Sequence, residues 1–368
     1  MHLASVFTYL SKWLHYIVGT DFNHVSSLPA TLTSRIKSYL SVTKSPVEIF
    51  SVSPAFEPSG IKSYSGGAHA EFFRPEGTMR EYVFKMCVES ADSEYPVIFD
   101  TGSPHIWVAS DSLVHGGFRF VSKSTDSLKK LTYLGGTVDC VLNSERLLFL
   151  GKKSSHSWKE TVCVAGQTSL GLTGYVGVLG ADLSSQFVKN NPIFWLSNLL
   201  YLGDTECTDG RSLVNIALSG RYLTENHWEF EASVTVGKDT PVPVYVSPDT
   251  GALRLYVGES IWNRLRVLWS EVGIRLLKLT KNGSPYISNS AGCGNMMDKM
   301  PSIIIHINQS KSITVSPIEY MKVVGSICIF YVTNLPRTDG NLILMGSSIL
   351  TKMNTRWDAA AKTFGVCL

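Results

Sequence analysis

The stretch "YPVIFDTGSPHIWVAS", residues 95–110, decides the fold of this chain of 368 residues. Residues 97–99 are three large apolar side chains with no polar residue between them, which predicts a strand buried on both faces. Residues 106–108 predict a second strand of the same kind. Asp100 stands in the tight loop between them, and a lone buried carboxylate is costly unless something pairs with it. On this segment alone, Asp100 could equally be a turn residue that nearby amides satisfy.

A second stretch, "PVPVYVSPDTGALRLYV" at residues 241–257, repeats the arrangement. Asp249 begins an Asp-Thr-Gly-Ala loop, with apolar residues 244–246 before it and apolar positions from Leu253 after it. A single Asp-Thr-Gly tripeptide is weak evidence for a site. Two copies, each set between apolar strands, indicate that the two carboxylates form a pair.

Such a pair carries a defined chemistry. Two buried carboxylates about 3 Å apart cannot both ionise, so they hold one proton between them. The ionised group can take a proton from a water molecule while the protonated group polarises a carbonyl. We expect the glycines to reach positive φ and approach the opposing loop closely, and the threonine hydroxyls to bond its backbone. The supporting residues are therefore Thr101, Gly102, Thr250 and Gly251.

The rest of the chain predicts an all-β protein, because short apolar strands alternate with Gly, Ser, Asn and Asp turns from about residue 66 onward. Two helices are expected. Residues 190–203 offer Asn191 as a cap, Pro192 at the first helical position and Gly203 as a stop. Residues 259–273 place apolar side chains on one face. Residues 1–65 are rich in Ser and are interpreted as a leader or pro-segment.

Composition excludes several classes of function. The net charge is +3 with scattered basic residues, which argues against nucleic-acid binding. No apolar run reaches the length of a membrane helix. The seven cysteines and nine histidines lack zinc-site spacing, so no metal is expected.

The N-terminal residues 1–19 could be a poor signal sequence, an amphipathic helix or part of a pro-segment. Cys140 and Cys163 could pair across adjacent strands.

Together these motifs resemble the pepsin-like aspartic proteases. The likeness spans roughly residues 75–368 and includes "LTYLGGTVDC" as the flap hairpin and "YVGVLGADL" behind the first active-site loop. It implies a bilobal all-β fold with two barrel-like lobes around a central cleft. Residues 66–218 would form the N-terminal lobe with the flap, and residues 219–368 the C-terminal lobe.

The resemblance also assigns roles to single residues. It implies that Asp100 and Asp249 are the catalytic carboxylates and that Ser103 supports the first of them. It implies that Trp107 packs near a flap whose Tyr133 and Gly135 cover the substrate. Further positions implied by the family pattern are Gly180 and Gly346 behind the two loops and a disulfide bond between Cys293 and Cys328.

The second motif departs from the family pattern, because Ala252 replaces the usual Thr or Ser and Ser347 follows Gly346. We interpret the chain as a divergent aspartic endopeptidase, made as a zymogen, with the hypothesis that Lys62 of the leader pairs with the carboxylates. It would act without a cofactor on a peptide or protein substrate, as a monomer, in the secretory pathway, an acidic vesicle or the extracellular space. The alternatives are a weak or inactive peptide-binding relative, and a structural or carbohydrate-binding β protein in which both loops are accidental.

Overall fold

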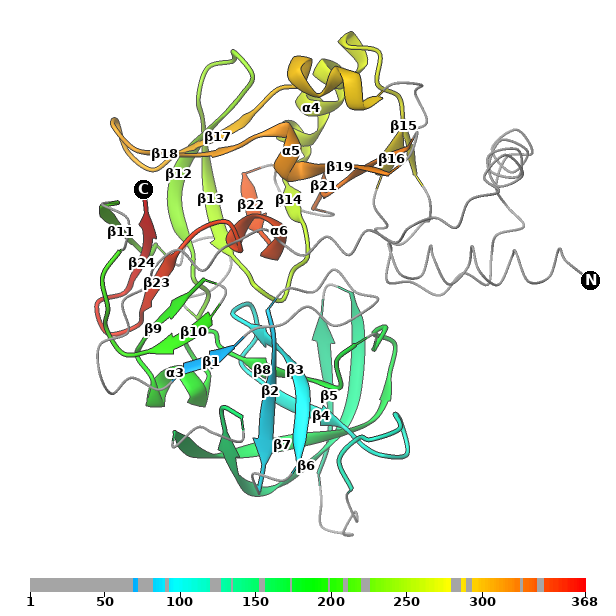
Figure 1. Ribbon diagram of the computed structural model, residues 1–368, viewed down its shortest axis with the longest axis vertical. Helices are drawn as coiled ribbons and strands as arrows, with labels where there is room; N and C mark the ends of the chain where they lie inside the picture. The colour runs from blue at the N-terminus through cyan, green and yellow to red at the C-terminus, as the bar shows by residue number, and fades with distance from the viewer. Residues whose placement is uncertain are drawn as a thin grey trace, which may run out of the picture.

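The structure is a computed structural model (Figure 1). The expected leader, residues 1–65 with Lys62, lies outside the residues that it describes. The described residues are 69–71, 82–89, 93–119, 127–133, 135–151, 156–172, 174–197, 199–207, 211–219, 226–278, 286–288, 293–324, 327–335 and 341–368.

The protein is mostly β, as expected, and its N-terminal half forms one seven-stranded sheet in the order β2-β3-β8-β4-β7-β6-β5. An added pairing between β2 and β6 closes six of these strands into a barrel. The predicted strands that flank Asp100 are β3 and β4, and their central residues are almost fully buried. The strands are β2 (Val83–Val88), β3 (Glu94–Asp100), β4 (Ile106–Ala109), β5 (Ser127–Tyr133), β6 (Gly136–Phe149), β7 (Ser157–Thr168) and β8 (Gly177–Gly180).

The C-terminal half contains a second seven-stranded sheet, in the order β18-β17-β12-β13-β22-β14-β21, and a four-stranded sheet, β15-β16-β20-β19. The first sheet comprises β12 (Phe230–Val236), β13 (Val242–Pro248), β14 (Leu255–Val257), β17 (Ile303–His306), β18 (Ser312–Val315), β21 (Val332–Asn334) and β22 (Leu342–Met345). The second comprises β15 (Leu276–Lys278), β16 (Tyr286–Ser288), β19 (Met321–Val324) and β20 (Ile327–Phe330).

A six-stranded sheet takes strands from both halves, in the order β1-β10-β9-β23-β24-β11, and lies beside them in Figure 1. The last strand of the chain, β24, belongs to this sheet. Aromatic side chains from both halves meet on it, with Phe194 stacked on Trp357 and Trp228 edge-on to Trp357. Its strands are β1 (His69–Glu71), β9 (Ile193–Leu196), β10 (Leu199–Leu202), β11 (Leu213–Ala217), β23 (Thr355–Asp358) and β24 (Thr363–Cys367).

The predicted helix at residues 190–203 is wrong, because this segment forms the hairpin β9–β10. Three consecutive residues, 194–196, are fully buried, which a one-sided surface helix cannot achieve but a central strand can. Asn191 does not begin a helix. Its side-chain amide donates to the Phe187 carbonyl at 3.0 Å and so ends the preceding helix α3 (Gln186–Asn190).

The second predicted helix is confirmed as α4 (Glu259–Glu271), which buries Ile261 and Leu265 and is followed by Gly273 at φ +83°. Two single-turn helices, α5 (Pro317–Tyr320) and α6 (Ser347–Leu350), follow in the same half. None of the helices in the described segments is both long and apolar enough to cross a membrane.

Candidate active site

Both Asp-Thr-Gly loops are held by the same strand arrangement. In the first half β8 runs parallel to β3 and antiparallel to β4, so it passes directly behind the Asp100 loop. In the second half β22 runs parallel to β13 and antiparallel to β14, behind the Asp249 loop. Gly180 ends β8, and Gly346 directly follows β22. A Cβ atom at Gly346 would lie 2.2 Å from the Arg254 carbonyl oxygen, so only glycine fits there.

The two loops are joined by hydrogen bonds between their threonines. The Thr101 amide donates to the Thr250 hydroxyl at 3.1 Å, and the Thr250 amide donates to the Thr101 hydroxyl at 3.0 Å. The Thr250 hydroxyl in turn donates to the Phe99 carbonyl at 2.5 Å. These buried bonds join residues of the two halves and confirm the contact expected of the threonines.

The two glycines are needed for close approach. A Cβ atom on Gly102 would lie 2.6 Å from the Asp249 carboxyl carbon, and one on Gly251 would lie 2.2 Å from Oδ1 of Asp100. The expectation of positive φ is wrong, because neither glycine is among those with positive φ. The absence of a side chain matters here for space, so that each loop can reach the carboxylate of the other.

Each carboxylate is held by donors of its own loop, but the two sets differ. Asp100, 6% exposed, accepts the Gly102 amide at 2.9 Å and the Ser103 hydroxyl at 2.7 Å. Asp249 accepts only backbone amides from the corresponding positions, Gly251 at 2.8 Å and Ala252 at 3.1 Å. The hydroxyl expected at Ser103 is therefore in place, and its counterpart is absent because residue 252 is alanine.

The surroundings of Asp249 favour its protonated form. Burial of the carboxyl group, the negative charge of Asp100 and a hydrogen bond with the Asp100 carboxyl group together raise the pKa of Asp249 well above its usual range. The amides of Gly251 and Ala252 lower it by less. The two acids are therefore close enough to bond directly, and Asp249 is the group that keeps a proton. Two unrelated turn acids would not be in contact.

The β5–β6 hairpin brings Tyr133 to this pair. Trp107, fully buried in β4, donates its indole N–H to the Tyr133 hydroxyl at 2.9 Å. Burial and the charge of Asp100 raise the pKa of the Tyr133 phenol, while hydrogen bonds with Trp107 and Ser103 lower it. Trp107 is thus both a core residue and a support for the hairpin, whose tip carries Gly135.

Two disulfide bonds join cysteines that both lie in the described segments. Cys140 pairs with Cys163, which confirms the cross-strand pairing and ties the hairpin strand β6 to β7. Cys207 pairs with Cys367 in strand β24, a bond for which the sequence carried no spacing signal. Cys328 is also in a disulfide, but the side chain of Cys293 lies outside the described residues, so that pairing stays a prediction.

His105 follows the first loop and is half-buried. Burial and the charge of Lys129 on β5 lower the pKa of this imidazole. In the ranges described above, no three His, Cys, Asp or Glu side chains lie close enough together to hold a metal ion.

The chain matches no protein-family model and no curated protein. The resemblance to pepsin-like proteases therefore rests on the motifs. The structure adds three features to these motifs: a pair of carboxyl groups that bond each other, hydrogen bonds between Thr101 and Thr250, and a hairpin that carries Tyr133 beside the pair.

Proposed function

We propose that this protein is an aspartic endopeptidase with a pepsin-like bilobal fold. The observation that carries the proposal is the contact between Asp100 and Asp249, in which one carboxyl group keeps a proton at a pH where an isolated aspartate would lose it. Three further features support it: the bonded threonines, the loop glycines that have no room for a side chain, and the hairpin that holds Tyr133.

The unequal donors assign different roles to the two acids. Asp100, which accepts from Gly102 and Ser103, acts as the anionic base and takes a proton from a water molecule held between the carboxyl groups. The water oxygen bonds to the carbonyl carbon of the scissile peptide. Asp249 meanwhile gives its proton to the carbonyl oxygen. The resulting diol collapses when the amide nitrogen receives the proton from Asp100 and the C–N bond breaks, and the second diol proton returns to Asp249.

The hairpin would act as the flap. Tyr133, anchored by Trp107, lies near Asp100 and would cover an extended peptide while the reaction proceeds. The disulfide between Cys140 and Cys163 holds the base of this hairpin to the neighbouring strand. The two disulfides fit an oxidising environment, and we place the enzyme in the secretory pathway, an acidic vesicle or the extracellular space.

A catalytically weak or inactive peptide-binding protein is the second candidate. Ala252 favours it, because the second carboxylate lacks the hydroxyl donor that Ser103 supplies to the first. The two candidates differ in turnover, since both would bind an extended peptide.

Digestion of a peptide library at acidic and neutral pH, followed by mass spectrometry, tests the proposal. The full chain should cleave peptides, and Asp100→Asn and Asp249→Asn should each lower kcat by about a hundredfold or more. Asp298→Asn, at an exposed position in the C-terminal half, is the matched control and should cleave normally. Binding without cleavage would favour the inactive relative. Equal cleavage by wild type and both dyad variants would overturn the proposed mechanism.

A further inference from the structure

The loop between strands β17 and β18 carries a short motif that the proposed function does not use. Residues 308–310 have the sequence Asn-Gln-Ser, which is an acceptor sequence (sequon) for N-linked glycosylation. The motif alone is weak evidence, because so short a sequence recurs by chance. It becomes informative where the asparagine is exposed on the folded protein and the chain enters the secretory pathway. The structure bears on both conditions.

The sequon lies at the exposed tip of a hairpin. All three of its residues are exposed, and they belong to the loop that joins β17 to β18. Strand β18 pairs only with β17 in the described part of the chain, so it forms one outer edge of the seven-stranded sheet. Figure 1 shows this hairpin, in orange, reaching outward at the upper left. A bulky group at its tip would therefore extend away from the described elements.

The Asn308 side chain uses its oxygen to hold the turn and leaves its nitrogen open. Oδ1 accepts the Ser310 amide at 2.9 Å, the Ser310 hydroxyl at 3.2 Å and the Lys311 amide at 2.9 Å, which together form an Asx-turn. Nδ2 has no hydrogen-bond acceptor among the described residues. An N-linked sugar replaces one hydrogen of Nδ2, so the three bonds to Oδ1 would remain in the modified protein.

The disulfide bonds bear on the second condition. Cys140 pairs with Cys163 and Cys207 pairs with Cys367. Such bonds persist in oxidising surroundings, which include the lumen of the endoplasmic reticulum, where N-linked oligosaccharides are attached. The inference therefore shares the compartment of the proposed function but does not need peptidase activity.

We propose that Asn308 carries an N-linked oligosaccharide. The donor is an oligosaccharide attached to a polyprenyl diphosphate. In the transfer, Nδ2 of Asn308 forms a bond to the anomeric carbon of the oligosaccharide and loses one proton. The bond between that carbon and the diphosphate oxygen breaks, and the polyprenyl diphosphate leaves with the electron pair, so nothing is oxidised or reduced.

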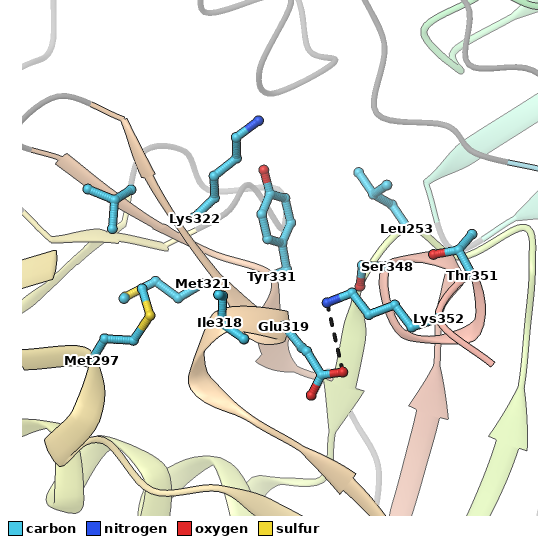
Figure 2. A pocket seen from close by; sticks show the side chains of 11 residues that line it. Leu253, Met297, Ile318, Glu319, Met321, Lys322, Tyr331, Ser348, Thr351 and Lys352 are labelled. Atoms are coloured by element: carbon cyan, nitrogen blue, oxygen red, sulfur yellow. Dashed lines mark ion pairs between the residues drawn. The ribbon is translucent and has the colours of Figure 1, made fainter. Parts of the chain in front are cut away.

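The glycan would stand apart from the candidate active site. His306, the last residue of β17, lies opposite Ser233, which in turn lies opposite Pro243, near the start of β13. Asp249 follows the far end of β13, about 20 Å along the strand at about 3.3 Å per residue. Figure 2 shows the pocket between the segment α5–β19 and helix α6, and its lining contains no residue of β17, β18 or their loop. Loss of the glycan should therefore leave peptide cleavage unchanged.

The test examines the full chain, with its own N-terminus, after secretion from a eukaryotic host. Trypsin places Asn308 in the peptide 300–311. The other sequon of the chain begins at Asn282, outside the described residues, and falls in the separate peptide 282–299, so mass spectrometry reads the two sites independently. Peptide N-glycosidase in heavy-oxygen water converts a glycosylated asparagine to labelled aspartate. We expect this label in the peptide 300–311.

Four variants separate a glycan from a merely structural turn. Asn308→Gln and Ser310→Ala should each lose the label completely, whereas Ser310→Thr keeps the hydroxyl and should retain it. Ser312→Ala, at an exposed position of β18 outside the sequon, is the matched control and should also retain it. An unlabelled peptide 300–311 from the wild-type chain, or label that survives in Ser310→Ala, would overturn the inference. Label without any cleavage of library peptides would instead count against the proposed function alone.

Discussion

Ala252→Ser tests the assigned roles of the two acids most sharply. The substitution gives the second loop the hydroxyl that Ser103 donates to Asp100 at 2.7 Å, at the same offset from its aspartate. A hydroxyl donor stabilises the ionised form of Asp249 and so lowers its pKa. Because Asp249 must stay protonated to polarise the carbonyl, activity would then be lost at a lower pH than in the wild type.

The size of the pKa shift of Asp249 follows from the energy of the added hydrogen bond. A hydrogen bond to a charged group contributes about 1.5–3 kcal/mol, and about 1.36 kcal/mol corresponds to one pH unit. We take the lower end, because Asp249 already accepts the amides of Gly251 and Ala252 and the new hydroxyl would be a third donor. The alkaline limb of the profile of kcat/KM against pH should therefore move about one unit toward acid.

Stopped assays on one peptide across the pH range measure this limb. Ala359→Ser, which adds a hydroxyl at a partly buried turn position, is the matched control and should leave the limb in place. A limb that stays fixed in Ala252→Ser, or moves toward alkaline pH, would refute the assignment of the proton to Asp249.

Two further variants test the surroundings of the pair. Tyr133→Phe removes the hydroxyl that accepts from Trp107, so kcat/KM should fall about tenfold while Tm changes by only a few degrees; unchanged kinetics would count against the flap role. Gly346→Ala places a Cβ atom 2.2 Å from the Arg254 carbonyl oxygen and should lower the free energy of unfolding by about 1–3 kcal/mol in urea titrations. Gly166→Ala, with nothing within 4 Å of its Cβ, should change it by no more than about 0.5 kcal/mol, and equal losses would contradict the steric argument.

The sequence predicted the centre of the molecule well because its signals there are local. Continuous apolar runs on either side of Asp100 indicate strands buried on both faces, and apolar residues on either side of Asp249 indicate strands as well. The structure has β3, β4, β13 and β14 at these places. The two Asp-Thr-Gly motifs predicted contact between distant loops, because a buried carboxylate needs a partner and each motif supplies one for the other. The role of Ser103 followed from the resemblance alone.

The errors concern features that depend on tertiary contacts. Residues 190–203 carry good helix-capping residues, yet the segment pairs with β23 and buries consecutive side chains. The bond between Cys207 and Cys367 joins residues 160 positions apart, and no local pattern encodes that distance. The sequence predicts that the loop glycines are needed for a positive φ. What excludes a side chain at these positions is the carboxylate of the opposite loop, which lies near only in the folded chain.

The central claim is that Asp100 and Asp249 jointly hold one proton and one water. Calorimetric titration with a statine-type mimic, whose hydroxyl takes the place of that water, and with its deoxy analogue measures this most directly. The account predicts that the hydroxyl tightens binding at least a hundredfold in the wild-type chain and adds almost nothing in Asp249→Asn. Equal affinities of the wild-type chain for the two compounds would contradict it.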